Sequence, residues 1–294
     1  MALIQLLETN IIFFISFVAV FSLAVGSFLN VVIHRLPIIM QSTWREQCTE
    51  FLAAENSSTE DSAATEEKNE KYNLLIPRSA CPKCGHQITA LENIPVISYL
   101  FLRGRCSDCG AAISMRYPAV ELTTAILSVI TALHFGYSLQ ALAALGFTWA
   151  LIPLFLIDFD HQILPDSITL PLLWSGLLLS LFNLFVDSHT SIIGAVAGYL
   201  SLWTIFHVFK LLTGKEGMGY GDFKLLGALG AWVGWQSLPV VILFSSVVGA
   251  AIGITLILFK GRDHSQPMPF GPFLAAAGWM TLLWGNDIIR LYLQ

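Results

Sequence analysis

The stretch GMGYGDFKLLGALGAWVGW runs from Gly217 to Trp235 and places an aspartate, Asp222, at the start of an apolar segment. Three glycines precede this aspartate within five residues, at Gly217, Gly219 and Gly221. Glycine weakens a helix, and a carboxylate is costly next to lipid. Helix capping by Asp222 is one explanation. The other is that the glycines leave room for an extended peptide beside a functional carboxylate.

The composition around this stretch indicates an integral membrane protein. Of 294 residues, 55% are hydrophobic and only 12% are charged, whereas soluble domains carry about 25% charged residues. Several apolar runs approach the roughly 20 residues that cross a bilayer. We predict eight spans, of which the sixth and seventh are separated only by Pro239, at residues 10–33, 118–136, 139–157, 168–186, 190–212, 223–237, 238–259 and 271–289. The first run has no basic segment or cleavage site of a signal peptide, so we expect a retained helix.

The basic residues predict the orientation of these spans. Of the 15 lysines and arginines, 14 lie in or beside the first, fifth and seventh loops, and only Arg290 lies on the other side. The positive-inside rule therefore places the odd-numbered loops in the cytoplasm and both termini outside. The 14 are Arg35, Arg45, Lys68, Lys71, Arg78, Lys83, Arg103, Arg105, Arg116, Lys210, Lys215, Lys224, Lys260 and Arg262.

The fold class that follows is an all-α polytopic membrane protein with about eight transmembrane helices and a small cytoplasmic module in the first loop. We predict a first transmembrane helix over 1–33, a cytoplasmic loop over 34–117 and a seven-helix membrane core over 118–294. The first part of the loop is acidic and poor in large apolar residues. We expect a marginal helix at Glu46–Ala54 and a flexible segment after it, and assign no function to residues 55–70.

The second part of the loop contains two CxxC pairs separated by 21 residues. This spacing is typical of a structural zinc site in which four thiolates surround one ion, and the module spans 81–109. The predicted ligands are Cys81, Cys84, Cys106 and Cys109. Gly85 and Gly110 follow the two pairs, where a tight turn requires positive φ. Two disulfides are the alternative, which a reducing cytoplasm disfavours.

Four thiolate ligands leave no open metal position, so we expect no catalysis at the metal. His86 lies beside the first pair and can replace a ligand, although four cysteines make this unnecessary. Cys48 stands alone, and we interpret it as a spare thiol.

Few carboxylates lie near the predicted spans. Asp158 follows an apolar run and belongs to the last turn of the third span, where the helix dipole disfavours a negative charge. An ionisable residue in such a place is a functional candidate. Asp166, followed by Ser167, resembles an N-cap of the fourth span, and Asp160 is expected to face water.

Asp158 and Asp222 both fall at the cytoplasmic ends of spans, so the two side chains can meet. Two adjacent carboxylates share one proton, as in aspartic proteases, where one activates water and the other polarises the scissile carbonyl. Lys224 either faces lipid headgroups or modulates Asp222. The sequence contains no HExxH, GxSxG or P-loop motif, so it offers no support for those classes of enzyme.

Taken together, these motifs resemble the bacterial type IV prepilin peptidases, which are GxGD-type membrane aspartic proteases. The resemblance covers nearly the whole chain and rests on GSFLNVVIHRLP at 26–37, the two CxxC pairs, RYPAVELTTA at 116–125, IDFDHQILPDSITLP at 157–171, GMGYGDFKLLGALGAWVGW at 217–235 and PFGPFLAAAG at 269–278. It implies that Asp158 and Asp222 are the catalytic dyad and that the four-cysteine module binds zinc.

The resemblance also implies two reactions in the bacterial inner membrane. The first removes the basic leader of type IV prepilins and type II secretion pseudopilins, after a glycine. The second methylates the new N-terminal residue, usually phenylalanine, with S-adenosylmethionine as the methyl donor. The implied partners are these substrates and the lipid bilayer, with no nucleic acid.

The sequence does not locate the methyl-donor site, because no glycine-rich methyltransferase motif is present. Glu121 can hold a cation or an amine, or it can be a helix-start carboxylate stabilised by the dipole. His34 and Arg35 can contact lipid phosphates or a substrate. Two alternative functions remain. One is a transporter whose paired aspartates form a proton or cation site and whose zinc knuckle is a docking module, and the other is a peptidase that does not methylate.

Overall fold

The computed structural model describes residues 2–56, 73–89, 91–215, 217–260 and 269–293. Lys68, Lys71, Arg262 and most of the acidic segment 55–70 lie outside these ranges. The described residues form helices and loops with two isolated β-bridges, which confirms the all-α prediction. The helices are α1 (Ala2–Thr9), α2 (Ile11–Asn56), α3 (Ile97–Phe101), α4 (Arg116–Phe135), α5 (Leu139–His161), α6 (Asp166–Ser180), α7 (Ser188–Thr213), α8 (Tyr220–Val233), α9 (Leu238–Lys260) and α10 (Gly271–Leu293).

Each of the eight predicted spans coincides with one of these helices. Within the described residues, five segments are long and apolar enough to cross a membrane: Ile11–Ala54, Arg116–Phe135, Leu139–His161, Ser188–Thr213 and Trp235–Thr255. The others are α6, α8 and α10. Because a helix rises about 1.5 Å per residue, the 15 residues of α6 and the 14 residues of α8 do not reach across a hydrocarbon core of about 30 Å.

The chain divides into two compact units. One comprises Leu23–Leu122, and the other comprises Met1–Ser22 together with Thr123–Gln294. We call them the loop unit and the helical unit. The predicted divisions after residues 33 and 117 each fall within a continuous helix, α2 and α4 respectively.

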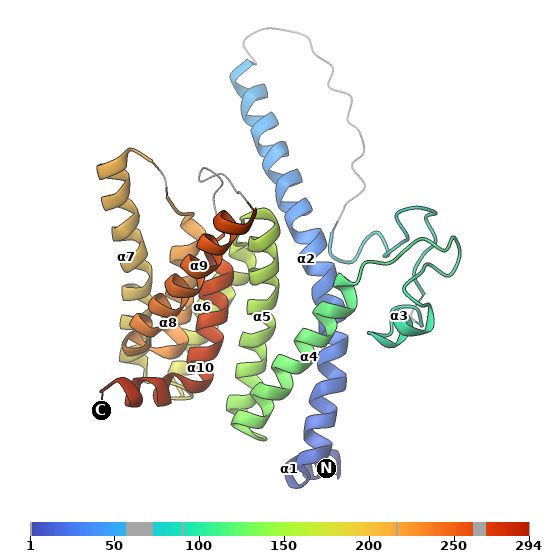
Figure 1. Cartoon of the computed structure of the whole chain (residues 1–294), viewed down its shortest axis with the longest axis horizontal. Coiled ribbons are helices and arrows are strands. Elements are labelled where there is room, and N and C mark those ends of the chain that lie inside the picture. The colour runs from blue at the N-terminus through green and yellow to red at the C-terminus, as the bar shows by residue number, and fades with distance from the viewer. Residues whose placement is uncertain (1, 57–72, 90, 216, 261–268, 294) are drawn as a thin grey trace. The chain divides into compact units, whose positions relative to one another are not determined.

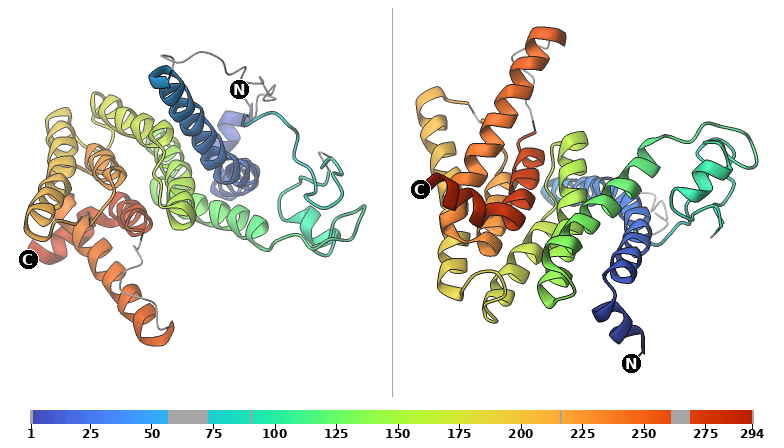
Figure 2. Two further views of the ribbon diagram at one scale, coloured as in Figure 1. Left: turned by 90° about the horizontal axis from the view of Figure 1, so that it is seen from above. Right: turned by 60° about the horizontal axis from the view of Figure 1, so that its bottom comes forward.

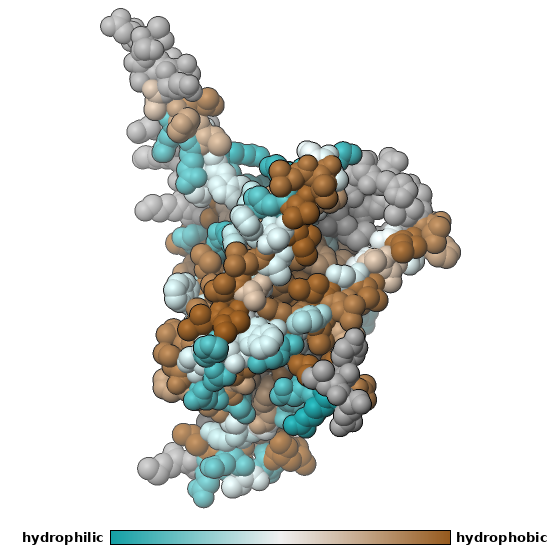
Figure 3. Space-filling view, turned by 90° about the vertical axis from the view of Figure 1, so that its left-hand side faces the viewer, coloured by the Kyte–Doolittle hydropathy of each residue, from teal (hydrophilic) through white to brown (hydrophobic). Residues whose placement is uncertain are grey.

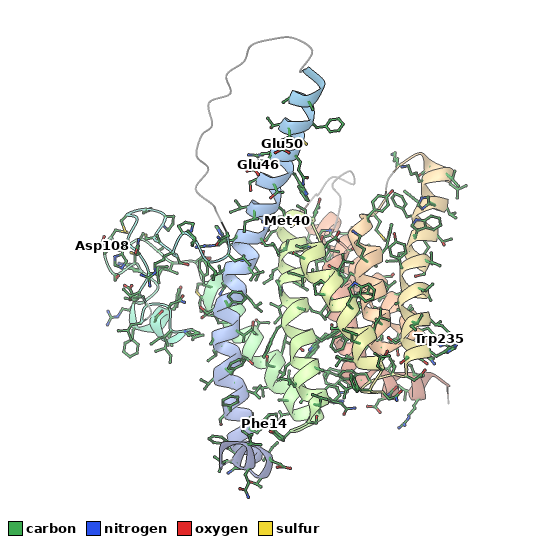
Figure 4. All side chains as sticks on the ribbon, turned by 180° about the vertical axis from the view of Figure 1, so that it is seen from behind. Phe14, Met40, Glu46, Glu50, Asp108 and Trp235 are labelled. Atoms are coloured by element: carbon green, nitrogen blue, oxygen red, sulfur yellow. The ribbon has the colours of Figure 1, made fainter. Side chains whose placement is uncertain are left out.

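The first predicted span does not end at residue 33. Helix α2 runs for 46 residues from Ile11 to Asn56 and includes the predicted marginal helix at Glu46–Ala54. Pro37 lies inside it, where it removes one backbone hydrogen bond without ending the helix. Met40, Glu46 and Glu50 mark the part of the helix that follows this proline (Figure 4).

Helix α8 is the centre of the helical unit, in contact with α6, α7 and α10 (Figure 1). Asp222, Phe223 and every residue from Leu225 to Val233 are buried. A helix that is apolar on all sides belongs inside a protein core or a bilayer, and α8 is surrounded by neighbouring helices. The sixth predicted span, which only Pro239 separates from the seventh in the sequence, is therefore a well enclosed helix of this unit.

Helices α7 and α8 approach each other at glycines. A Cβ atom on Gly194 or Gly230 would collide with the backbone of the other residue, and a Cβ on Gly198 would lie 2.5 Å from the Leu226 carbonyl oxygen. Small residues spaced in this way allow close packing of helices in membranes. The packing fixes the position of α8, the helix that carries Asp222.

The break between α8 and α9 lies before Pro239, not at it. Gly234 adopts a φ of 79° and starts a short 3-10 turn over Trp235–Ser237, and α9 then begins at Leu238. Pro239 thus occupies the first turn of α9, where its missing N–H costs no helical hydrogen bond.

Hydrophobic side chains cover much of the surface, as expected for a protein surrounded by lipid. On the face shown in Figure 3, brown hydrophobic residues lie in the open. The C-terminal part of α9, drawn in orange, leads away from the neighbouring helices (Figure 2), and its Leu258 and Phe259 are exposed.

Candidate active site and metal centre

Asp158 lies in the last turn of α5, as predicted. Gln162 ends this helix in the left-handed conformation, with its N–H donating to the Asp158 carbonyl oxygen. The Asp158 carboxylate is 5% exposed and accepts a hydrogen bond of 3.0 Å from the backbone N–H of Gly271, the first residue of α10. The positive end of α10 therefore faces a carboxylate that its own helix disfavours.

Asp222 lies in the first turn of α8 and is 7% exposed. Gly219 occupies the N-cap position without a side-chain hydrogen bond, and its backbone N–H interacts with the Asp222 carboxylate. Asp222 Oδ1 is buried and has no hydrogen-bond donor among the described residues. Capping of α8 therefore involves at most one of the two carboxylate oxygens.

The helical unit brings the two aspartates together. Asp158 and Asp222 interact electrostatically, although 63 residues separate them in the sequence. Leu164 packs beside both sites, because a Cβ on Gly221 would lie 2.7 Å from Leu164 Cβ and a Cβ on Gly271 would lie 3.2 Å from Leu164 Cδ1. The α5–α6 connection thus packs against the glycines on either side of the carboxylate pair.

The other carboxylates near this pair have different environments. Asp160 is exposed, as predicted. Asp166 is not an N-cap: Pro165 holds that position, and Asp166 is the first residue of α6. Its carboxylate instead forms an ion pair of 2.7 Å with Nζ of Lys224. Lys224 therefore contacts a carboxylate outside the dyad.

The four cysteines of the loop unit form one cluster, with all Sγ atoms within 4.8 Å of one another. The Sγ atoms of Cys81 and Cys109 are 3.8 Å apart, and those of Cys84 and Cys106 are 3.9 Å apart. In a tetrahedron with Zn–S bonds of about 2.3 Å, sulfur atoms lie about 3.8 Å apart, whereas a disulfide bond measures about 2.05 Å. The cysteines are free thiols, and their geometry fits a four-coordinate metal ion.

The two CxxC pairs form matching loops, which we call knuckles: Ala80–Gln87 and Arg105–Ala112, each closed by an antiparallel bridge between its ends. Gly85 and Gly110 adopt φ values of 73° and 69°, as predicted, and donate to the carbonyls of Cys81 and Cys106. The repeated unit is too short to stand out in the sequence. Asp108 marks the second knuckle in Figure 4.

His86 and Cys48 are not part of the metal cluster. The His86 ring contacts the carboxylate of Glu92 at 3.2 Å and the hydroxyl of Ser107 at 3.4 Å. Hydrogen bonds from Ser107, Thr89 and His86 lower the pKa of Glu92 to about 2. Cys48 is exposed on α2.

The remaining candidates lie in the loop unit. Glu121 is not at the helix start but one turn into α4, and its Oε2 accepts a hydrogen bond of 2.7 Å from the Val96 N–H. Arg35 is buried, with Nη1 donating to the carbonyls of Asn73 and Leu74, so its guanidinium orders a loop of the protein. His34 is exposed.

Sequence reasoning missed the role of Gly271. Gly271 and Pro272 open α10, and a Gly-Pro pair before an apolar run is a helix-start signal. That signal places the N–H of residue 271 at a helix N-terminus, but only the tertiary packing directs it at Asp158.

Two protein families match successive parts of the chain. Residues 20–135 match the family described as the bacterial peptidase A24 N-terminal domain, and residues 145–254 match the type IV leader peptidase family. No solved structure matches the chain.

Relatives named "Prepilin leader peptidase/N-methyltransferase" cover almost the whole chain. The protein from Aeromonas salmonicida (strain A449) is 56% identical over 281 residues, 96% of this chain and 94% of the relative. The protein from Pseudomonas aeruginosa (strain PAO1) is 52% identical over 294 residues, 100% of this chain and 98% of the relative. The protein from Legionella pneumophila is 46% identical over 276 residues, 94% and 93% of the two chains.

Proposed function

Because the chain belongs to the family of bacterial prepilin leader peptidases/N-methyltransferases, we propose that it cleaves the leader from prepilins and then methylates the new N-terminus. The enzyme is a multi-pass protein of the inner membrane. Membership of a peptidase family decides against the transporter alternative. The substrates include type IV prepilins and type II secretion pseudopilins, and the residue methylated is usually phenylalanine.

The observation that supports the peptidase site is the pair of buried carboxylates, Asp158 and Asp222, whose charges interact at the ends of α5 and α8. They belong to the proposed peptidase core, residues 118–294. The Gly271 N–H supports one carboxylate, and Asp222 Oδ1 is left available to a water molecule or a substrate group.

This pair catalyses peptide hydrolysis by sharing one proton. The ionised carboxylate accepts a proton from water as the water oxygen forms a bond to the scissile carbonyl carbon, and the protonated carboxylic acid donates a hydrogen bond to the carbonyl oxygen. The C–N bond then breaks, and the dyad transfers a proton to the departing amine nitrogen. The products are a leader with a free carboxylate and a pilin with a free amine.

The charge distribution supports the orientation of this reaction. The positive-inside rule places the ends of α5 and α8 that carry the dyad in the cytoplasm and both termini in the periplasm. A prepilin with its basic leader in the cytoplasm presents its cleavage site to the same face.

Two bound groups complete the proposal. The four cysteines hold one structural zinc ion, which is supported by the Sγ separations of 3.8 and 3.9 Å. The methyl donor is S-adenosylmethionine, which when bound would supply an electrophilic methyl group for the new N-terminal amine.

The test is leader cleavage by Asp158→Asn and Asp222→Asn variants in membranes. General acid–base catalysis contributes about 100-fold or more, so we expect each variant to lose at least that factor in kcat/KM while still inserting. Asp160→Asn is the matched control, since this exposed carboxylate lies on the same turn of α5. Near-normal cleavage by either dyad variant would refute the assignment.

The same variants separate the two reactions. Supplied with a pilin peptide that already carries a free N-terminal phenylalanine, they should methylate it as the unmodified enzyme does. Mass spectrometry of the N-terminus measures both outcomes, and loss of methylation together with cleavage would place both reactions at one site.

A further inference from the structure

The loop unit contains a cavity of about 630 Å³, within the range of small-molecule sites. Every residue that lines it belongs to Leu23–Leu122, and the walls come from α2, the two knuckles, the α3 segment and the start of α4. The dyad belongs to the other unit and takes no part in it. The proposed cleavage reaction therefore leaves this cavity unexplained.

Glu121 is the most unusual group in the cavity wall. Its side chain is a carboxylate on a residue only 7% exposed, with hydrogen bonds from the Val96 N–H and an interaction with the Ser27 side chain. Among the described residues, Glu121 forms no ion pair. A buried carboxylate without a protein counter-ion is costly, so its environment favours a cationic ligand.

The rest of the wall suits a ligand with several chemical parts. Tyr99 and Tyr117 line the cavity and offer aromatic rings, which bind sulfonium-like cations and stack on planar bases. Arg78 and Lys83 line it as well and provide positive charge for a carboxylate. The cavity thus combines an anionic group, cationic groups and aromatic surface.

We propose that this cavity binds the methyl donor, S-adenosylmethionine, with the Glu121 carboxylate facing its sulfonium. The donor contains a sulfonium cation, an amino acid carboxylate and a planar adenine, and each has a chemically matching group in the wall. The inference rests on the proposed methyltransferase function and assigns it a site in the loop unit.

Direct binding to the full-length protein in nanodiscs tests this site. S-adenosylmethionine carries the sulfonium charge, and S-adenosylhomocysteine is its neutral thioether counterpart. Calorimetry should give the unmodified protein a clear preference for the charged ligand. In Glu121→Gln, where the amide oxygen can still accept the Val96 N–H, the affinity for S-adenosylmethionine should fall about tenfold or more and that for S-adenosylhomocysteine less than about threefold.

The affinities for the two ligands distinguish recognition of the sulfonium charge by Glu121 from a purely structural role of Glu121. If Glu121 only orders the loop, both affinities will fall together, and that result overturns the proposal. Leu122→Ala, an exposed neighbour on α4 that does not line the cavity, should leave both affinities unchanged.

A second variant tests the cavity without touching a charge. Val31→Phe adds bulk to the α2 wall and should abolish binding of both ligands, whereas Val20→Phe makes the same change at an exposed position of α2. Leader cleavage should persist in both variants. If Val31→Phe binds both ligands as well as the unmodified protein does, the methyl donor binds elsewhere. If the unmodified enzyme cleaves pilins without methylating them, the proposed function itself is wrong.

Discussion

The carboxylate pair and the cysteine cluster are assembled in opposite ways. Asp158 and Asp222 come from two helices and meet because α5, α6, α8 and α10 pack around one another. The four thiols come from two short loops with matching backbone hydrogen bonds, and each loop orients two ligands by its own local contacts. One site is a product of tertiary packing, and the other is a product of local sequence.

This difference predicts how each site fails. A locally built metal site depends on its ligands and on the ion, whereas a site built by packing depends on any residue that sets the distance between helices. Since the sites belong to separate compact units, damage to one should leave the other largely intact.

Removal of the metal should have the largest effect. Structural zinc contributes on the order of 10 kcal/mol of apparent binding free energy in small metal-dependent folds, so the Cys81→Ser/Cys84→Ser variant should lose its ion and the order of the knuckles. Metal analysis by mass spectrometry should show about one zinc ion per chain before the change and none after it. Proteolysis within residues 79–113 should accelerate.

Leader cleavage measured in the same variant tests whether the carboxylate pair depends on the cysteine cluster. We expect cleavage to remain within about threefold of the unmodified enzyme, because the dyad lies in the other unit. Cys48→Ser is the matched control and should keep its zinc. Unchanged metal content in the double variant would rule out the cysteine cluster as the zinc site.

The second largest effect is expected for Gly271→Ala in the helical unit. The added Cβ would lie 2.6 Å from Asp158 Oδ2, so the carboxylate or the start of α10 must move. A displacement of about 1 Å at a catalytic group can lower the rate about 100-fold, and we expect a loss of that order in kcat/KM for cleavage with zinc content unchanged.

Gly146→Ala provides the control for this substitution. It lies on α5, the helix of Asp158, but a Cβ there would meet no atom within 4 Å. Cleavage should be normal in this variant. Normal cleavage in Gly271→Ala as well would show that the α10 N-terminus does not set the geometry of Asp158.

The smallest effect is expected for Lys224→Gln, which removes the ion pair with Asp166. The two side chains are 34% and 51% exposed, and exposed pairs contribute about 0–1 kcal/mol. The melting temperature should fall slightly and cleavage should stay within about threefold. The matched change Asp166→Asn should behave in the same way, and a tenfold loss in Lys224→Gln alone would mean that Lys224 acts directly on the dyad.

The metal site was the most predictable part of the molecule. Two CxxC pairs with glycine after each specify the turn and the ligand directions, and the structure confirms the clustering of Cys81, Cys84, Cys106 and Cys109. Asp158 could be placed at a helix end because the apolar run stops there. Its pairing with Asp222 was a prediction from topology, and the structure supports it because the two charges interact.

The remaining features depend on contacts that sequence patterns do not encode. Pro37 resembles a helix end, yet α2 continues through it to Asn56. Asp166 resembles an N-cap, but Lys224, 58 residues away, determines its partner. Gly271 is important only because tertiary packing brings the start of α10 against Asp158, where the Gly271 N–H donates to its carboxylate.

The paired knuckles also have a consequence for how the segment between them can vary. Binding of a metal ion at both ends of a loop offsets the conformational entropy that is lost when the loop closes. This entropic cost grows only slowly with loop length. Glu92 is constrained because its carboxylate contacts His86 and Ser107, one in each knuckle, but the rest of the 21 residues between Cys84 and Cys106 can change with little effect on metal binding. Val96 and Tyr99 lie in this segment and line the cavity, so ligand preference can diverge there while the scaffold stays the same.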